Sequence, residues 1–295
     1  MPRLVYMALI GLSLIWGGSF YFVKVLLHDF GPATIAFLRS SAGLVTVTLI
    51  MLVLGKPFGF RTIPWVRMAV MATINTAIPW SLIALSETRL TSSMASILNA
   101  TTPVWTIIVG ILLFGQRSSR SQWLGIAAAS VGVVLLVGYE PGAVGSVNLV
   151  GFLCMLGATL CYAVGSQLSK RLLGGFSMYQ ITFGTLISAM VVSGGVAFST
   201  ESIALSDLVT STNLLMIIGL GVFGSGIAYI LFYYMVQQGS AEFATMVTYL
   251  VPCTALIWGY TLLGESIAWN MVAGLVIILG GVYVAGRKRA EERAH

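Results

Sequence analysis

The chain has little charge. Asp, Glu, Lys and Arg make up 8% of its 295 residues, whereas 58% are hydrophobic and the mean hydropathy is +0.96. Soluble domains average about 25% charged residues, so this composition excludes a surface that faces water throughout. The sequence therefore predicts an integral membrane protein whose main partner is the lipid bilayer.

Reactive side chains are also scarce. The two histidines, His28 and His295, have no clustered partner, and the three cysteines, Cys154, Cys161 and Cys253, all lie in apolar runs. An enzyme needs a cluster of acids, bases or nucleophiles, and an odd number of such cysteines does not indicate a disulfide framework. We therefore expect no enzyme activity, no cofactor and no metal site. The net charge of +6 is scattered over short connections, so we expect neither nucleic acid nor an obligate protein as a partner.

Long apolar runs dominate what is present. Charged, Gly- or Pro-bearing breaks separate ten of them, and most are long enough to cross a bilayer as a helix. They lack the strict alternation of a barrel strand, so helices are the structure that satisfies the backbone in lipid. The expected spans are roughly 4–27, 33–54, 64–85, 92–114, 121–138, 149–172, 178–199, 213–236, 241–263 and 267–286.

The basic residues concentrate on one side of the expected spans. Most of the 15 Lys and Arg fall in connections on the side of the N-terminus or in the C-terminal tail. Such residues are retained in the cytoplasm, so we expect both termini there, in a bacterial inner (plasma) membrane. The outer connections instead carry Asp29, Glu87, Glu140, Glu201, Asp207 and Glu265.

The two halves of the chain repeat each other. One constant offset aligns Pro103 with Pro252, and a similar offset aligns earlier positions. Five spans that repeat as five spans place the second copy upside down, an arrangement common in secondary transporters with a midplane substrate site. The sequence thus predicts two inverted repeats, 1–140 and 141–295, around a central cavity. Further aligned pairs are Trp16 with Tyr162, Trp80 with Tyr229, Gly115 with Gly264, Gly125 with Gly274 and Gly132 with Gly281.

The chain resembles the drug/metabolite transporter superfamily, in its ten-span EamA-type branch. The residues that carry the resemblance are Trp16-Gly17-Gly18-Ser19, Phe37-Leu38-Arg39, Pro103 with Gly115-Gln116, and Pro252 with Gly264-Glu265. The resemblance covers about residues 5–286 and departs at Gln116, where the family usually has Glu. It implies an all-α integral membrane fold of ten helices and export of small metabolites, often amino acids.

Polar residues and aromatics inside spans are candidates for substrate contacts, because they are costly in lipid and tend to face the bundle interior. Ser96, Asn99 and Pro103 share one helix face, and each proline frees the carbonyl four residues earlier. Packing between helices is the alternative role for these residues, and it stays open here. The candidate substrate-binding residues are Trp16, Asn75, Pro79, Trp80, Ser96, Asn99, Pro103, Tyr162, Tyr229, Thr245, Thr248 and Pro252.

Charged residues near span ends give two further expectations. For Lys24 and Arg39 we expect side chains that reach the headgroups, the alternative being a cationic patch that draws in a carboxylate substrate. We place none of the nine acids at midspan; Glu242 falls in the first turn of a helix. Proton-coupled carriers commonly use a buried acid, so we expect transport without proton coupling through a buried carboxylate.

A glycine-rich stretch, GLGVFGSG at 219–226, matches the G-x-G-x-x-G pattern of dinucleotide-binding folds. That pattern has meaning only after a strand in a soluble unit, and this stretch lies inside an apolar run. We interpret it as close helix packing, with a bend or local unwinding as the alternative.

The expected function is therefore export of a small metabolite, with amino acids bearing apolar or aromatic side chains as the expected class, by alternating access. The alternative within transport is an exporter of drugs or lipid-like amphiphiles. Alternatives of another class are a gated channel and a non-transporting membrane scaffold.

Overall fold

A computed structural model describes residues 3–115, 119–137, 148–172, 175–238 and 247–291, and within these ranges there is no strand. The helical elements follow one another with short connections. In chain order they are α1 (Arg3–Leu26), α2 (Pro32–Val53), α3 (Trp65–Ala72), η1 (Thr73–Ala77), α4 (Ile78–Glu87), α5 (Ser92–Asn99), α6 (Thr102–Phe114), α7 (Arg120–Val137), α8 (Leu149–Leu172), α9 (Met178–Thr200), α10 (Leu205–Leu208), α11 (Ser211–Ile217), η2 (Ile218–Ile227), α12 (Ala228–Gln238), α14 (Val247–Leu263) and α15 (Trp269–Glu291).

Within the described residues, seven helical stretches are long and apolar enough to cross a membrane. Three shorter apolar helices, Arg120–Leu136, Val247–Leu263 and Trp269–Ala285, accompany them. Large hydrophobic side chains cover the outside, among them Leu112 and Val53, which are 73% and 85% exposed. Lipid is the solvent that such a surface requires, so the chain is an all-α integral membrane protein.

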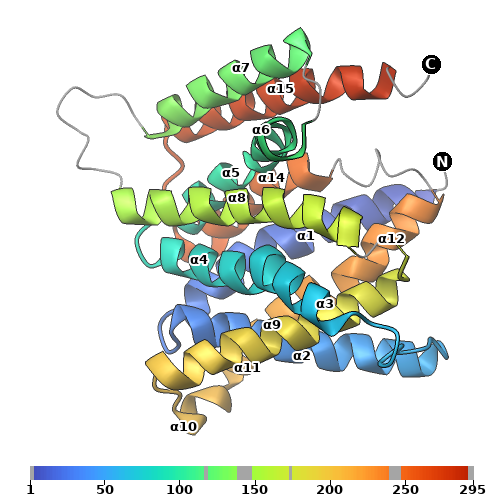
Figure 1. The fold of residues 1–295 in the computed structure, drawn as a ribbon. Coiled ribbons are helices and arrows are strands. Elements are labelled where there is room, and N and C mark those ends of the chain that lie inside the picture. Colours follow the sequence, from blue (N-terminus) through green and yellow to red (C-terminus); the bar gives the residue numbers. More distant parts are fainter. Residues whose placement is uncertain (1–2, 116–118, 138–147, 173–174, 239–246, 292–295) are drawn as a thin grey trace.

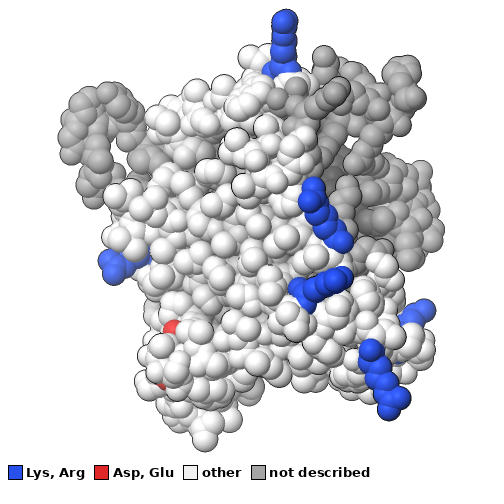
Figure 2. Space-filling model, viewed as in Figure 1, with Lys and Arg blue, Asp and Glu red and all other residues white. Residues whose placement is uncertain are grey.

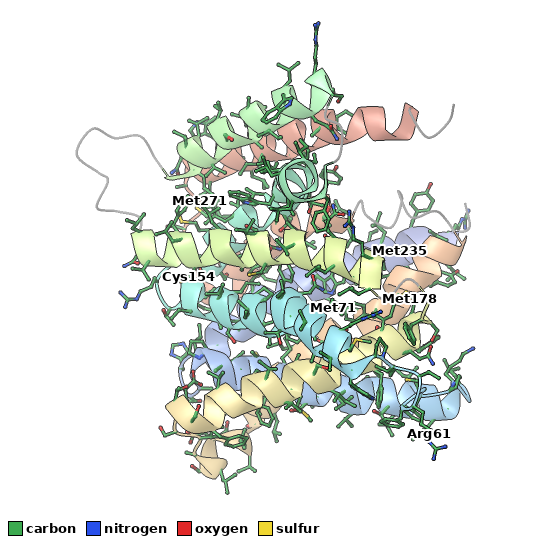
Figure 3. All side chains as sticks on the ribbon, in the orientation of Figure 1. Arg61, Met71, Cys154, Met178, Met235 and Met271 are labelled. Carbon is green, nitrogen blue, oxygen red and sulfur yellow. The ribbon has the colours of Figure 1, made fainter. Side chains whose placement is uncertain are left out.

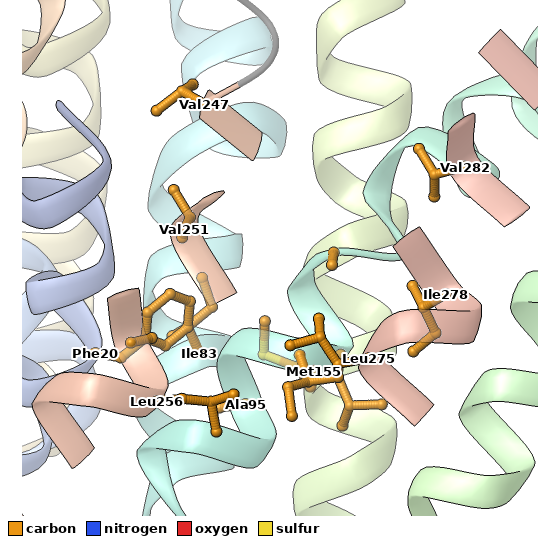
Figure 4. Close-up of a cluster of buried hydrophobic side chains, with 14 of the residues drawn as sticks. Phe20, Ile83, Ala95, Met155, Val247, Val251, Leu256, Leu275, Ile278 and Val282 are labelled. Atoms are coloured by element: carbon orange, nitrogen blue, oxygen red, sulfur yellow. The ribbon is translucent and has the colours of Figure 1, made fainter. Parts of the chain in front are cut away.

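Helices from distant parts of the sequence pack together (Figure 1). In the largest cluster of buried side chains, α1, α4, α8, α14 and α15 contribute Phe20, Ile83, Met155, Leu256 and Ile278 (Figure 4). The first and last thirds of the chain therefore share one core.

The pair α7 and α15 lies side by side along one edge of the bundle (Figure 1). Their backbones touch because glycines face each other. A Cβ on Gly281 would lie 2.6 Å from the carbonyl oxygen of Gly125, and one on Gly132 would lie 2.8 Å from that of Gly274. Small residues at such crossings allow close van der Waals packing, which is a main source of helix association in lipid.

The glycine-rich stretch lies in η2, a π-helical segment. A Cβ on Gly219 would lie 2.7 Å from the ring of Phe22, while Gly221 and Gly226 press against Ala42 and Thr46 of α2. The expectation of close packing is thus confirmed. The π geometry adds a local departure from α-helix, a form that often occurs at functional sites.

One end of the bundle carries Asp29, Glu87, Glu201 and Glu265, and we call it the acidic end. Two of its carboxylates, those of Glu201 and Glu265, cap helices across the two halves of the chain. Glu201 accepts hydrogen bonds from the N–H groups of Ala33 (2.9 Å) and Thr34 (2.8 Å) at the start of α2. Figure 2 shows acidic atoms at the left edge of the molecule and most of the basic residues on the opposite side, toward the termini.

Removal of the Glu201 cap should loosen the acidic end. Its carboxylate accepts two backbone N–H groups and the Thr34 hydroxyl at 2.7 Å, and a capping carboxylate at a helix N-terminus stabilises by about 1–2 kcal/mol. We expect Glu201→Ala to lower the melting temperature of the detergent-purified protein. The control is Asp207→Ala, which removes a half-buried acid whose carboxylate bonds only its neighbour Ser206 in the described part of the chain. Equal melting temperatures for the two variants would contradict the capping role.

Candidate functional site

Arg39, on α2, lies at the centre of the candidate site. Its Nε donates to the hydroxyl of Ser225 on η2 at 3.0 Å, and its guanidinium carbon lies 3.9 Å from the centre of the Trp80 ring on α4. The expectation that this side chain reaches the headgroups is therefore wrong. Arginine favours the aromatic stack because its planar cation is attracted to the face of the ring.

The terminal nitrogens of Arg39 are free in the described part of the chain. The bond to Ser225 uses only Nε, which leaves the Nη groups without a protein acceptor. The carboxylate that interacts with Arg39 over longer range, Glu87, makes no hydrogen bond. A guanidinium carries five N–H donors in a fixed fork that matches a carboxylate. The site therefore presents a half-buried cation with unused donors.

Two tyrosines complete the surroundings of Arg39. Tyr162 on α8 and Tyr229 on α12 both lie within electrostatic range of the guanidinium. Trp80 and Tyr229 are partners in the internal repeat. The structure thus brings three of the four predicted aromatics around one cation.

A cavity of about 160 Å³ begins beside Tyr229. Asn75 of η1 faces it, with the hydroxyl-bearing side chains Ser169, Thr182 and Thr185 across from it. Met71, which also lines the cavity and is 1% exposed, lies inside the bundle, whereas Arg61 lies at its edge (Figure 3). Drug-sized ligands occupy pockets of about 300–1,000 Å³, so this hollow is suited to a small molecule.

The helices depart from regular α-helix near both asparagine candidates, Asn75 and Asn99. Pro79 is the second residue of α4, two positions after the π-helical segment η1 ends, and the wider turn accommodates its missing N–H. Between α5 and α6, the carbonyl of Asn99 accepts the hydroxyl of Thr102 at 2.7 Å, just before Pro103. A side chain therefore satisfies this carbonyl, while the amide oxygen of Asn99 is buried without a hydrogen bond.

The other predicted residues lie elsewhere. Trp16 donates to the carbonyl of Gly224 at 3.2 Å and braces α1 against η2. Ser96 is buried and bonds the carbonyl of Ser93, and Pro252 is buried inside α14. Thr248 is exposed in the first turn of α14, and Thr245 lies outside the described residues. The bonds of Trp16 and Ser96 thus go to backbone carbonyls and not to Arg39.

No acid in the described residues lies at midspan, as expected, but Glu87 at the end of α4 is nevertheless buried. It is the last residue of α4, is 0% exposed, and both carboxylate oxygens lack a hydrogen bond. The sequence predicts that Glu87 lies in a connection, because the polar residues Thr88 and Arg89 follow it. Lys24 also differs from its expectation, since its ammonium donates to the carbonyls of Glu87 and Leu90 (2.8 Å for the latter) rather than to headgroups.

Sequence reasoning missed several site residues. Ser169, Thr182, Thr185 and Ser225 have hydroxyls that ordinarily bond the preceding turn of a helix, so they carry no special signal. Thr182 and Thr185 are three positions apart, the spacing of one helix face, which is the signal that was available. In the ranges that the structure covers, no group of three His, Cys, Asp or Glu could hold a metal ion.

Comparisons with known proteins agree with this architecture. The sequence profile of the EamA-like transporter family matches residues 3–138 and 149–287. An uncharacterized transporter of Archaeoglobus fulgidus is 25% identical over 93% of this chain and 95% of its own. Protein PecM of Dickeya dadantii is 25% identical over 92% of this chain and 88% of its own, and the uncharacterized inner membrane transporter YedA of Escherichia coli K12 is 26% identical over 88% and 83%.

A solved structure shows the same fold. It superposes with a TM-score of 0.68 at 15% identity and covers 99% of this chain and 100% of its own. The profile match extends over nearly the whole sequence, and its two segments together contain all the residues around Arg39. The chain therefore belongs to the EamA-like transporter family, and it is a multi-pass membrane transporter of the drug/metabolite type.

Proposed function

We propose that the protein exports small metabolites that carry a carboxylate, in particular amino acids with apolar or aromatic side chains, by alternating access. The observation that carries the proposal is Arg39, whose Nη groups have no protein acceptor in the described residues and whose guanidinium lies 3.9 Å from the Trp80 ring centre. Trp80, Tyr162 and Tyr229 supply apolar faces for the side chain of such a substrate.

The energetics favour a substrate role for this cation. An ionisable side chain among membrane spans is expensive and usually marks a substrate or ion pathway. A substrate carboxylate that accepts two N–H groups from Arg39 would supply the missing counter-charge. The neighbouring cavity, with Asn75 and Thr182 in its wall, offers polar groups for the rest of a small zwitterion.

The moving parts in this proposal are the inverted repeats, 1–140 and 141–295. Their support is the symmetry of the α7 and α15 contact, because Gly125 meets Gly281 while its repeat partner Gly274 meets Gly132. That reciprocal pattern is what a two-fold relation between halves requires. Rocking of one half against the other would expose the Arg39 site to each side in turn.

The conformation of the structure fits one stage of that cycle. At the acidic end, carboxylates cap helix ends across the two halves. The cavity is lined instead by Ser169 near the end of α8 and Ile181 near the start of α9, on the side away from the acidic end. With both termini in the cytoplasm of a bacterial inner membrane, this stage is closed to the outside. The location is supported by the alternation of basic residues and by the name of the relative YedA, an inner membrane transporter.

We do not propose that transport is independent of protons. That expectation depended on the absence of a buried acid, and Glu87 is a buried acid. The drug or amphiphile exporter is the less favoured alternative, since the cavity of about 160 Å³ is small for such ligands. A carrier exchanges substrate across the membrane by counterflow, whereas a gated channel and a non-transporting scaffold do not.

Liposome transport is the test of this function. Purified protein is reconstituted and loaded with single amino acids, their amides, or amphiphilic cationic drugs, and counterflow of radiolabelled substrate is measured. We expect saturable counterflow with apolar or aromatic amino acids and much less with the matching amides. Flux without counterflow would indicate a channel, counterflow with the drugs alone would indicate an amphiphile exporter, and no flux of any compound would favour a scaffold.

A further inference from the structure

Unsatisfied polar atoms gather at the acidic end of the bundle. Both carboxylate oxygens of Glu87 and the hydroxyls of Ser86 and Ser92 are buried without a hydrogen bond, and all three residues are 0% exposed. Buried polar atoms are nearly always paired in folded proteins. Several unpaired atoms at one place therefore indicate a site whose ligand is small enough to enter a closed structure.

Glu87 cannot be stable as an anion in this environment. An ionised carboxylate that has lost water and gained no donor pays a desolvation cost far above that of the neutral acid. Backbone donors are not available to it, since the nearby N–H groups of Ser92 (2.7 Å) and Ser93 (3.0 Å) at the start of α5 are occupied by Glu265. The neutral acid is consequently the stable form while the acidic end is closed.

The charged groups that act on Glu87 come from three other elements. They are Lys24 on α1, Glu265 in the connection after α14, and Arg39 on α2. The ammonium of Lys24 is held by the carbonyls of Glu87 and Leu90, and no ion pair joins it to the Glu87 carboxylate in the described ranges. From α8, which packs against Ser86 and Arg89 through Gly151, no charged group is recorded as acting on Glu87.

A proton fits this site better than a metal ion. A metal cation would need several oxygen ligands and would lie near Lys24, whose positive charge opposes it. A proton needs only the carboxylate, and it removes the repulsion between Glu87 and Glu265.

We propose that Glu87 is a proton-binding site that locks the acidic end of the transporter. With the proton on Glu87, Glu265 keeps its bonds to α5 and the two halves stay joined. When the proton leaves to the water at the acidic end, the negative charge repels Glu265, attracts Lys24 away from the carbonyls of Glu87 and Leu90, and requires hydration. All three effects favour the open acidic end.

The sign of the pH effect follows from this linkage. The closed state holds one more proton than the open state, so a fall in pH favours closure and a rise in pH favours opening.

The test measures how accessible Ser92 is. In a background with Cys154, Cys161 and Cys253 replaced by alanine, the S92C variant is labelled in lipid nanodiscs with a membrane-impermeant maleimide. The labelling rate of S92C is divided by the labelling rate of a T88C variant. Thr88 is exposed and adjacent to Glu87, so this division corrects for the effect of pH on thiol ionisation. A single titrating carboxylate can change an open-to-closed ratio by up to about tenfold per pH unit, so we expect the rate ratio to rise severalfold between about pH 5 and about pH 8.

The variants decide the assignment, and no transport substrate is required. Glu87→Gln, a neutral isostere of the protonated acid, should give a low and pH-independent ratio, whereas Glu87→Asp should restore the pH response. If Glu87→Gln fails to give monodisperse protein, the Glu87→Asp variant decides through the midpoint of its pH response, which should shift from that of the parent. The proposal is overturned by a flat ratio in the parent, by a pH response that survives in Glu87→Gln, by an unshifted midpoint in Glu87→Asp, or by a ratio that follows sodium at constant pH.

Discussion

Replacing Arg39 with glutamine is expected to weaken binding of a carboxylate substrate by about ten- to a hundredfold, because a hydrogen bond to a charged group contributes about 1.5–3 kcal/mol. The variant keeps a polar side chain but loses the cation and the fork of N–H donors that faces no acceptor in the described structure. The measurement is the substrate concentration for half-maximal counterflow in proteoliposomes, together with direct binding by the detergent-solubilised protein. Its melting temperature should change little, because the half-buried charge that is removed has no ion-pair partner in the described residues.

Two controls separate recognition from a general loss of function. Arg89→Gln removes an exposed arginine from the acidic end and should leave substrate affinity unchanged. Arg39→Lys keeps the charge but not the planar fork, so we expect an intermediate affinity. Affinity in Arg39→Gln that equals that of Arg89→Gln would exclude Arg39 from the substrate site, whatever the protein transports.

Introducing a methyl group at Gly281 is expected to disrupt the α7 and α15 pair. The added Cβ would lie 2.6 Å from both the backbone nitrogen of Ala129 and the carbonyl oxygen of Gly125. Backbone atoms cannot move aside as a flexible side chain can, so the helices must separate and lose their close packing. We expect Gly281→Ala to lower the melting temperature in mild detergent by several degrees, the scale of a destabilisation of about 1–3 kcal/mol.

The neighbouring residue is a matched control. A Cβ on Gly280 would have no atom within 4 Å, and Ala is preferred over Gly in helices by about 1 kcal/mol. Gly280→Ala should therefore leave the melting temperature unchanged or raise it. If both variants behave alike, the close glycine contact does not determine the stability of this pair.

Part of the candidate site could be predicted from sequence alone. Asn75, Trp80, Tyr162 and Tyr229 were identified as polar or aromatic side chains inside apolar runs. The internal repeat also paired Trp80 with Tyr229 and Tyr162 with Trp16. Each of the first four contacts the cavity or lies near Arg39 in the structure. Trp16 and Ser96 carried the same signals, yet their bonds go to backbone carbonyls. Periodicity does not show which polar face meets a cavity and which braces a neighbouring helix.

Arg39 and Glu87 show the limits of reasoning from position along a span. Both lie near the ends of apolar runs, where charged side chains usually reach water. Their surroundings are instead set by other helices, with Trp80 of α4 beneath one and Lys24 of α1 beside the other. Contacts between distant segments decide whether a terminal charge is solvated, and no local pattern records them.

The sequence by itself determined the solvent, the all-helical class and the family, because scarcity of charge, long apolar runs and repeated Pro and Gly positions are properties of the chain before it folds. Only the tertiary structure decided which charges are buried and which donors stay unused. Those properties depend on the few side chains that packing brings within hydrogen-bond distance, as at Arg39 and Ser225 from α2 and η2.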